Sequence, residues 1–269
     1  HYVAPSVWAW ASGRARKVAR FLDHLLTLLP FEPPYFEIEG LTSTCVGHPV
    51  TESGADKGDG PAFRARHGIA LDALVLCVLP GSRATEVARL LPVFLDTVKR
   101  LAARFGKLHV VVPAVPALAG RIESATDDQL PPVTLLCNEK EKFHAFAASD
   151  AALAASGTVS LELAMAGVPM VVAYRMNLLT TWLAKRLILV KYVSLVNLLL
   201  DRSAIPEFLS GNCRPEFLAQ ALETLLTDAV ACEEQRASFA EALAMIGQGG
   251  EPPSLKAARL VFSCVKNAH

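Results

Sequence analysis

The stretch 74–92, LVLCVLPGSRATEVARLLP, decides the fold, because a buried strand runs through a sharp turn directly into a helix. The apolar run 73–79 is typical of a strand covered on both faces of a parallel sheet. A proline and Gly81 end the strand, and Ser82 is placed to cap the helix that follows. The first turn of a helix leaves N–H groups unpaired and attracts negative charge, and Arg83 adds a guanidinium suited to phosphate oxygens. The sequence therefore predicts a phosphorylated ligand at this turn.

Length and composition narrow the class of protein. The 269 residues are enough for about two domains. Because 26 basic residues balance 26 acidic ones, the surface has no overall charge bias toward nucleic acid, and no nucleic-acid partner is expected. The apolar segment 178–200 is interrupted by Lys185, Arg186 and Lys191, so we expect no membrane span. Six scattered cysteines without a C-x-x-C pair favour a reducing cytoplasm.

Strand-like and helix-like segments alternate along the chain, which predicts an α/β protein with parallel sheets and ligands beyond the carboxyl ends of the strands. The segment 51–61 has three glycines, four charged residues and almost nothing apolar, so it is interpreted as a linker between domains. The expected strands or short extended segments are 2–10, 25–31, 44–50, 73–79, 108–112, 133–136, 150–154 and 169–174, and the expected helices are 12–26, 83–104, 139–148, 158–166, 178–190, 214–227, 230–246 and 254–266.

A second turn resembles the first. A strand of small residues, 151–155, is followed by Ser156, Gly157 and Thr158 and then by a helix. Two such turns on one sheet would suit the two phosphates of a diphosphate, and Glu162 is placed to accept hydrogen bonds from sugar or ribose hydroxyls. The alternative is that the Ser-Gly-Thr turn only caps its helix.

Other candidate features have simpler interpretations. The basic segment 12–20 could bind anionic groups, but such runs are more often solvated helix faces. His24, His48 and His144 lack metal-ligand spacing. The chain contains neither a G-x-G-x-x-G motif after a strand nor a P-loop nor a G-x-S-x-G elbow. We therefore expect neither a metal ion nor another cofactor.

Seven strings occur in one order along the chain and together resemble lipid-A-disaccharide synthase, over nearly its whole length. They are Tyr2–Trp10 (YVAPSVWAW), Leu28–Pro33 (LLPFEP), Val46–Pro49 (VGHP), Leu79–Arg83 (LPGSR) with Glu86, Ala155–Thr158 (ASGT) with Leu161–Glu162, Val171–Arg175 (VVAYR) and Tyr192–Asn197 (YVSLVN).

The resemblance implies a GT-B glycosyltransferase, in which two Rossmann-like domains with parallel sheets face each other across a cleft. Residues 1–60 would be the last part of the acceptor-side domain, incomplete in this chain, 61–250 the UDP-sugar domain, and 251–269 a crossover helix. The implied reaction transfers 2,3-diacylglucosamine from UDP-2,3-diacylglucosamine to 2,3-diacylglucosamine 1-phosphate (lipid X), giving lipid A disaccharide 1-phosphate and UDP. Because similar enzymes carry their base in the first half of the acceptor-side domain, upstream of this sequence, we expect the chain to be a fragment of a hexosyltransferase. Whether this fragment is active alone is left open.

The resemblance also implies which residues touch the substrate, with Arg83 and Asn197 as the catalytic candidates. Two substitutions fall in loops expected to face the cleft, because Val196 and Leu178 stand where similar proteins usually have proline. The expected substrate-binding residues are Gly81, Ser82, Arg83, Ser156, Gly157 and Thr158 for the diphosphate, Glu162 for the ribose, the backbone of Cys137 and Asn138 for the uracil, and Glu207.

The acylated substrates give the apolar, cation-dotted segment 178–200 a second interpretation, as a patch that binds the inner-membrane surface from the cytoplasm. The alternative is core packing with solvated cations. Three other readings of function remain open: a non-catalytic UDP-sugar-binding protein, a different GT-B transferase, and a UDP-sugar epimerase. The oligomeric state, including a homodimer, is also open.

Overall fold

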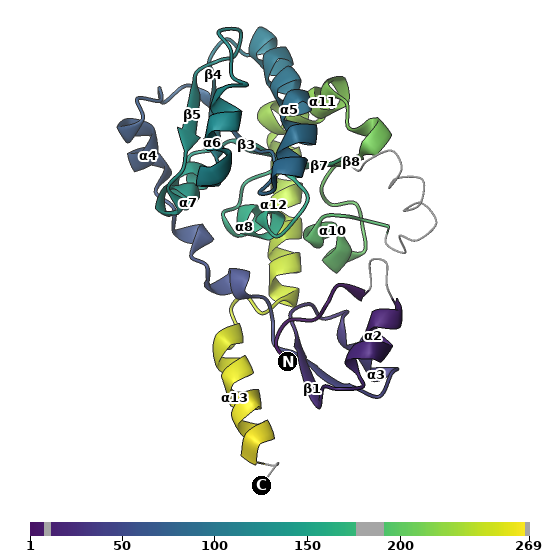
Figure 1. Ribbon diagram of the computed structural model, residues 1–269. Helices are drawn as coiled ribbons and strands as arrows, with labels where there is room; N and C mark the ends of the chain where they lie inside the picture. The colour runs from purple at the N-terminus through teal and green to yellow at the C-terminus, as the bar shows by residue number, and fades with distance from the viewer. Residues whose placement is uncertain (8–11, 176–190, 267–269) are drawn as a thin grey trace.

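The computed structural model describes residues 1–7, 12–175 and 191–266. Its larger part is built on six parallel strands: β3 (Leu74–Leu79), β4 (Leu108–Pro113), β5 (Val133–Leu136), β6 (Ala151–Ala155), β7 (Met170–Tyr174) and β8 (Glu207–Leu209). Their order in the sheet is β5-β4-β3-β6-β7-β8 (Figure 1). The predicted α/β class with parallel strands is confirmed, and β8 is an edge strand that the sequence pattern does not predict.

The helices follow the expected alternation over most of this part. The helices of the described residues are α2 (Ser12–Val18), α3 (Pro33–Glu37), α4 (Gly60–Arg66), α5 (Ala84–Arg104), α6 (Pro116–Glu123), α7 (Glu139–Ala147), α8 (Val159–Met165), α10 (Leu195–Leu200), α11 (Pro215–Thr227), α12 (Ala229–Met245) and α13 (Pro253–Lys266), with 3-10 turns at Pro49–Glu52, Ala55–Lys57 and Ser210–Asn212. The expected helix 178–190 lies outside the described residues.

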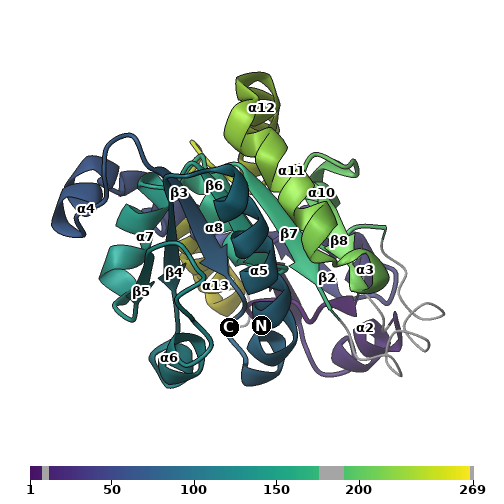
Figure 2. The ribbon, with the colours of Figure 1, turned by 90° about the horizontal axis from the view of Figure 1, so that it is seen from above.

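Helices cover both faces of the six-stranded sheet. Alternate residues of β3 divide between two cores: Val75 and Cys77 pack with side chains of α4, α7, α8, α10 and α12, whereas Leu76 and Val78 pack with those of α5, α6 and α11. Figure 2 shows α4 and α7 toward one end of the sheet and α10 and α11 toward the other. Because a strand buried on both faces needs apolar residues at every position, the run in β3 is explained.

Near the start of the chain, a second and smaller pair of parallel strands is formed by β1 (His24–Thr27) and β2 (Thr42–Cys45), and we call the described residues 1–7 and 12–45 the small unit. The expected helix 12–26 ends at Val18, and the expected strand 25–31 ends at Thr27. The strand stops because the chain turns at Glu32, whose carboxylate accepts hydrogen bonds from the N–H groups of Leu28 and Leu29. A small core packs beneath it, with Phe36 fully buried.

The expected linker 51–61 is folded against the larger sheet. A Cβ atom on Gly58 would lie 2.0 Å from the carbonyl oxygen of Phe143, and one on Gly60 would lie 2.3 Å from that of Ala147. The N–H of Asp59 donates to Nδ1 of His144 at 2.8 Å. The glycines therefore allow backbone contact with α7. The domain limits 1–60, 61–250 and 251–269 stay predictions.

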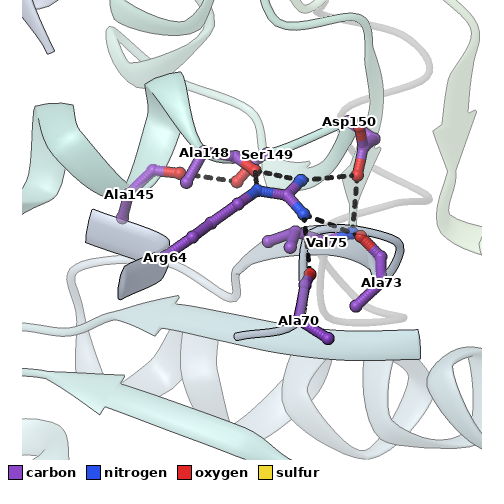
Figure 3. Close-up of polar contacts among 8 residues, drawn as sticks. All are labelled: Arg64, Ala70, Ala73, Val75, Ala145, Ala148, Ser149 and Asp150. Carbon is purple, nitrogen blue, oxygen red and sulfur yellow. Dashed lines mark hydrogen bonds and ion pairs between the residues drawn. The ribbon is translucent and has the colours of Figure 1, made fainter. Parts of the chain in front are cut away.

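Arg64 fastens α4 to the start of two central strands (Figure 3). Its guanidinium donates to the carbonyl oxygens of Ala148 (2.8 and 3.1 Å) and Ala73 (2.8 Å), and it pairs with Asp150 at 3.1 Å. The carboxylate of Asp150 also accepts the N–H of Val75 at 2.7 Å. Arg64 and Asp150 together therefore connect the start of β3 with the start of β6.

The final helix leaves the larger part and runs back beside the small unit (Figure 1). Ser254, in its first turn, bonds the carboxylate of Glu52 through both its N–H (2.9 Å) and its hydroxyl (2.6 Å). The expected helices 214–227, 230–246 and 254–266 are confirmed. No helix among the described residues is long and apolar enough to cross a membrane.

Candidate functional site

The turn after β3 is shaped by a glycine and a glutamate. Gly81 has a φ of +119°, and a Cβ atom there would lie 2.7 Å from Cβ of Glu86. Ser82 was expected to cap α5, and this expectation is wrong: the N-cap residue is Arg83. The carboxylate of Glu86 accepts the N–H groups of Ser82 (3.2 Å) and Arg83 (3.4 Å). In a capping box, glutamate at the third helical position accepts the N–H of the N-cap residue, and Glu86 does so here for Arg83.

The guanidinium of Arg83 is paired with the same carboxylate. Its Nη1 lies 2.7 Å from Oε1 of Glu86, while the arginine side chain is 77% exposed. The donors of this turn therefore bind a carboxylate of the chain itself in this structure. A phosphate using these donors must exchange with Glu86 or share them.

The second turn follows β6, whose five residues are all buried. The hydroxyl of Ser156 donates to the carbonyl oxygen of Val193 at 2.8 Å, so it is committed to a neighbouring loop. Gly157 faces open space, because a Cβ atom there would meet nothing within 4 Å. Thr158 is the N-cap residue of α8 without a side-chain cap bond. The turn thus presents backbone at an accessible helix start, as a close approach by a ligand requires.

Both turns line one cavity of about 440 Å³. They meet because β3 and β6 are parallel neighbours, with Leu79 opposite Ala154 in the register, so their carboxyl ends share one edge of the sheet. A larger hollow of about 680 Å³ lies beside α11 and α12 and includes none of the predicted site residues. The predicted residues that line the cavity are Gly81, Ser82, Arg83, Asn138, Ser156, Gly157, Thr158 and Glu162.

The far wall of this cavity carries an ion pair that joins two helices. Nζ of Lys142, on α7, lies 2.9 and 3.0 Å from the two carboxylate oxygens of Glu162, on α8. Asn138 caps α7 by accepting the N–H of Lys140 at 3.0 Å. Cys137 is exposed and does not line the cavity. Sequence reasoning missed Lys142; the signal was its position one turn into a helix that starts at the same sheet edge.

Asn197 and Glu207 lie together but outside this cavity. Nδ2 of Asn197 donates to Glu207 (2.7 Å) and to the carbonyl of Ile205 (2.8 Å), and its Oδ1 accepts the N–H groups of Ala204 and Ile205. Asn197 is fully buried. The carboxylate of Glu207 also accepts the N–H of Val193 at 2.9 Å. All hydrogen-bonding groups of the asparagine are therefore used inside the protein.

The loop held by this pair touches the second turn, because Ser156 donates to Val193. The α10 helix begins without the proline expected at position 196, since the hydroxyl of Ser194 accepts the N–H of Asn197 at 3.2 Å and Val196 is buried in the first turn. The other substitution, Leu178, and the patch residues Trp182, Lys185 and Arg186 lie outside the described residues.

The histidines considered as ligands each have a protein partner. Nδ1 of His48 accepts the N–H of Val50 at 3.1 Å, and burial lowers the pKa of His48. Nε2 of His24 lies 2.9 Å from the hydroxyl of Thr44. Within residues 1–7, 12–175 and 191–266, no group of three or more His, Cys, Asp or Glu side chains is arranged to hold a metal ion.

Comparison with known proteins shows which family the chain resembles. The family model of lipid-A-disaccharide synthetase matches residues 1–251. Lipid-A-disaccharide synthase of Rhodospirillum centenum is 56% identical over 98% of this chain and 66% of its own length. The same enzyme of Paramagnetospirillum magneticum is 50% identical over 99% of this chain and 68% of its own length. The chain therefore spans about two thirds of the length of these relatives.

A solved structure extends the likeness to the fold. The crystal structure of WaaG, a glycosyltransferase involved in lipopolysaccharide biosynthesis, superposes with a TM-score of 0.52 at 16% identity, covering 87% of this chain and 61% of that one. At this identity the likeness concerns the fold alone, and it confirms the predicted GT-B class.

Proposed function

Because the chain belongs to the lipid-A-disaccharide synthetase family, we propose that its cavity binds the UDP part of UDP-2,3-diacylglucosamine and that the protein transfers the diacylglucosamine unit to lipid X. The products would be lipid A disaccharide 1-phosphate and UDP. The observation that carries the proposal is the single cavity in which both predicted anion-binding turns meet. Two helix starts and an arginine at one sheet edge suit a diphosphate.

Within this proposal, the diphosphate lies between the turn of Gly81, Ser82 and Arg83 and the second turn, 156–158. Glu162 accepts hydrogen bonds from the ribose, and the backbone at Cys137 and Asn138 meets the uracil. The position of Asn138 in the cavity wall supports the last assignment more than that of Cys137 does.

The chemistry requires stabilisation of the negative charge that builds on UDP as it leaves, and a base for the acceptor hydroxyl. Arg83 and the starts of α5 and α8 would supply the first without a metal ion. We assign the base to none of the described residues. Asn197 was predicted as catalytic, but its burial favours a positioning role, in which it and Glu207 fix the loop that contacts Ser156.

The test is UDP binding by calorimetry, with Arg83→Ala as the variant and Arg202→Ala as the control. Arg202 is half-exposed and, like Arg83, is paired with a glutamate, but it lies outside the cavity. Because Arg83→Ala loses a charge-assisted hydrogen bond, it should bind UDP about tenfold more weakly than the wild type. The dissociation constant of UDP should be unchanged in Arg202→Ala. Absence of UDP binding, or an unchanged dissociation constant in Arg83→Ala, would overturn the proposed site.

Activity is tested separately, by assaying disaccharide formation from the two diacyl sugars with this chain and with a full-length relative. Disaccharide formed by the relative supports the transferase. If the relative binds UDP but forms no disaccharide, the protein is better explained as a non-catalytic UDP-sugar-binding protein, another GT-B transferase or a UDP-sugar epimerase. The proposed UDP-binding site would still hold in that case.

The acylated substrates also support a location at the cytoplasmic surface of the inner membrane, with the protein bound peripherally. Flotation with anionic vesicles tests this, and failure to float would refute it. A homodimer is a further possibility that analytical ultracentrifugation decides.

A further inference from the structure

Lys142 contacts Glu162 in a way that fixes the orientation of the carboxylate. One ammonium nitrogen lies 2.9 and 3.0 Å from the two oxygens, and the side chains are only 27% and 20% exposed. Because each carboxylate oxygen has two acceptor positions, the pairing leaves one position on each oxygen for another donor. The carboxylate is therefore held in place without being saturated.

The lysine itself is held by its surroundings. Nζ lies 4.9 Å from the centroid of the Phe143 ring, a favourable cation–π distance. Phe143 packs against the core, and its carbonyl is in close backbone contact with Gly58. A fixed helix thus carries the ammonium group to one place in the cavity wall. Restricting both partners in this way lowers the entropy lost when a ligand binds.

We propose that Lys142 is a positioning residue, which holds Glu162 so that its two oxygens accept hydrogen bonds from a pair of neighbouring hydroxyls on the ligand. This rests on the proposed function, in which Glu162 faces the ribose of UDP. A site with an oriented acceptor for a hydroxyl discriminates strongly against a ligand that lacks it. Lys142 therefore determines how well the protein distinguishes a ribose from a deoxyribose.

A different role for Lys142 makes a different prediction. If its ammonium bound a phosphate directly, removing it would weaken UDP and 2′-deoxy-UDP equally. If it only positions Glu162, removing it weakens UDP more than 2′-deoxy-UDP, and the ratio of the two dissociation constants falls. A change in overall stability alone would leave this ratio unaltered.

The experiment measures both dissociation constants by calorimetry for the wild type, Lys142→Met, Lys142→Arg, Glu162→Gln and the double variant Lys142→Met/Glu162→Gln. We expect the wild type to prefer UDP by about tenfold, as one charge-assisted hydrogen bond provides. The preference should fall to about twofold in Lys142→Met, be partly restored in Lys142→Arg, and fall no further in the double variant. Lys99→Met, which removes a lysine paired with Asp127 outside the cavity, is the matched control.

The possible failures are distinguishable. If the wild type binds no UDP, the proposed function is wrong and the role of Lys142 is wrong with it. If the wild type prefers UDP and Lys142→Met keeps that preference, or weakens both ligands equally, only the positioning role is wrong. Circular dichroism confirms that each variant is folded before its binding is measured.

Discussion

Replacing Glu86 by glutamine should strengthen UDP binding, because the carboxylate occupies donors that a phosphate needs. Its oxygens accept two N–H groups of the turn and pair with Arg83 at 2.7 Å. The pair is largely solvent-exposed on the arginine side, so it contributes about 0.5 kcal/mol. The hydrogen bonds from the two N–H groups of the turn to Glu86 contribute about 1 kcal/mol to the stability of the turn, and the neutral amide oxygen of a glutamine would keep about half of this. A phosphate of UDP would therefore displace the glutamine at a cost about 1 kcal/mol lower than for Glu86, and UDP should bind about fivefold more tightly to Glu86→Gln than to the wild type.

Calorimetry on wild type and Glu86→Gln at equal ionic strength measures this difference. The matched control is Glu233→Gln, since Glu233 also pairs with an arginine at i,i+3 spacing and lies outside the cavity. The control should leave the UDP dissociation constant unchanged. Weaker UDP binding in Glu86→Gln would refute the reasoning, because it would show that Glu86 organises the turn for the phosphate and does not compete with it.

Three further predictions concern stability and the shape of the turn. Arg64→Met removes five hydrogen bonds made by a side chain that is only 14% exposed, so it should lower the free energy of unfolding by about 3 kcal/mol. Urea unfolding measures this change. The control Arg202→Ala removes an exposed ion pair and should lower it by less than about 1 kcal/mol. Gly81→Ala should weaken UDP binding more than about tenfold, because the new Cβ atom clashes with Glu86 and an alanine is strained at a positive φ. The control is Gly249→Ala, where φ is also positive but no atom lies near the new Cβ. This variant should bind UDP as the wild type does. Burial lowers the pKa of His48, so the unfolded chain binds more protons than the folded one below about pH 6.5, and the free energy of unfolding decreases as the pH is lowered. His48→Asn, which keeps a capping acceptor, should reduce that decrease, as measured by urea unfolding at about pH 7.5 and about pH 5.5.

The sequence predicts the central elements of the fold because their residues are dominated by one physical demand. The run in β3 has to be apolar on both faces, and α5 continues it with a regular amphipathic pattern. Prediction from the sequence fails where local preferences and tertiary contacts favour different structures. No helix is predicted between the expected strands 108–112 and 133–136, yet Pro116 starts α6 as its first residue. The glycines of 51–61 read as flexible, yet they serve a close backbone contact.

The sequence correctly indicates which residues next to strand ends share one cavity, but it does not indicate how the side chains pair. The positions of Gly81 and Gly157 follow from turn chemistry and from the parallel order of β3 and β6. The partners of Arg83 and Glu162 do not, because the choice of Glu86 and Lys142 depends on rotamers and on the distance between α7 and α8. Ser156 shows the same limit, since its hydroxyl bonds a loop 37 residues away in sequence.

The two ion pairs of the cavity have different consequences for a diphosphate. Arg83 and Glu86 lie on one helix end, and the arginine is mostly in water, so the pair can open at little cost. Lys142 and Glu162 join two helices, and both side chains are largely buried, so separating them would leave charges poorly solvated. A ligand that brings negative charge is therefore accommodated on the Arg83 side, where a carboxylate can leave. The Lys142 side keeps its carboxylate and is suited to uncharged hydroxyls. Under the proposed function, this asymmetry would orient UDP in the cavity, with its phosphates at the two turns and its ribose hydroxyls at Glu162.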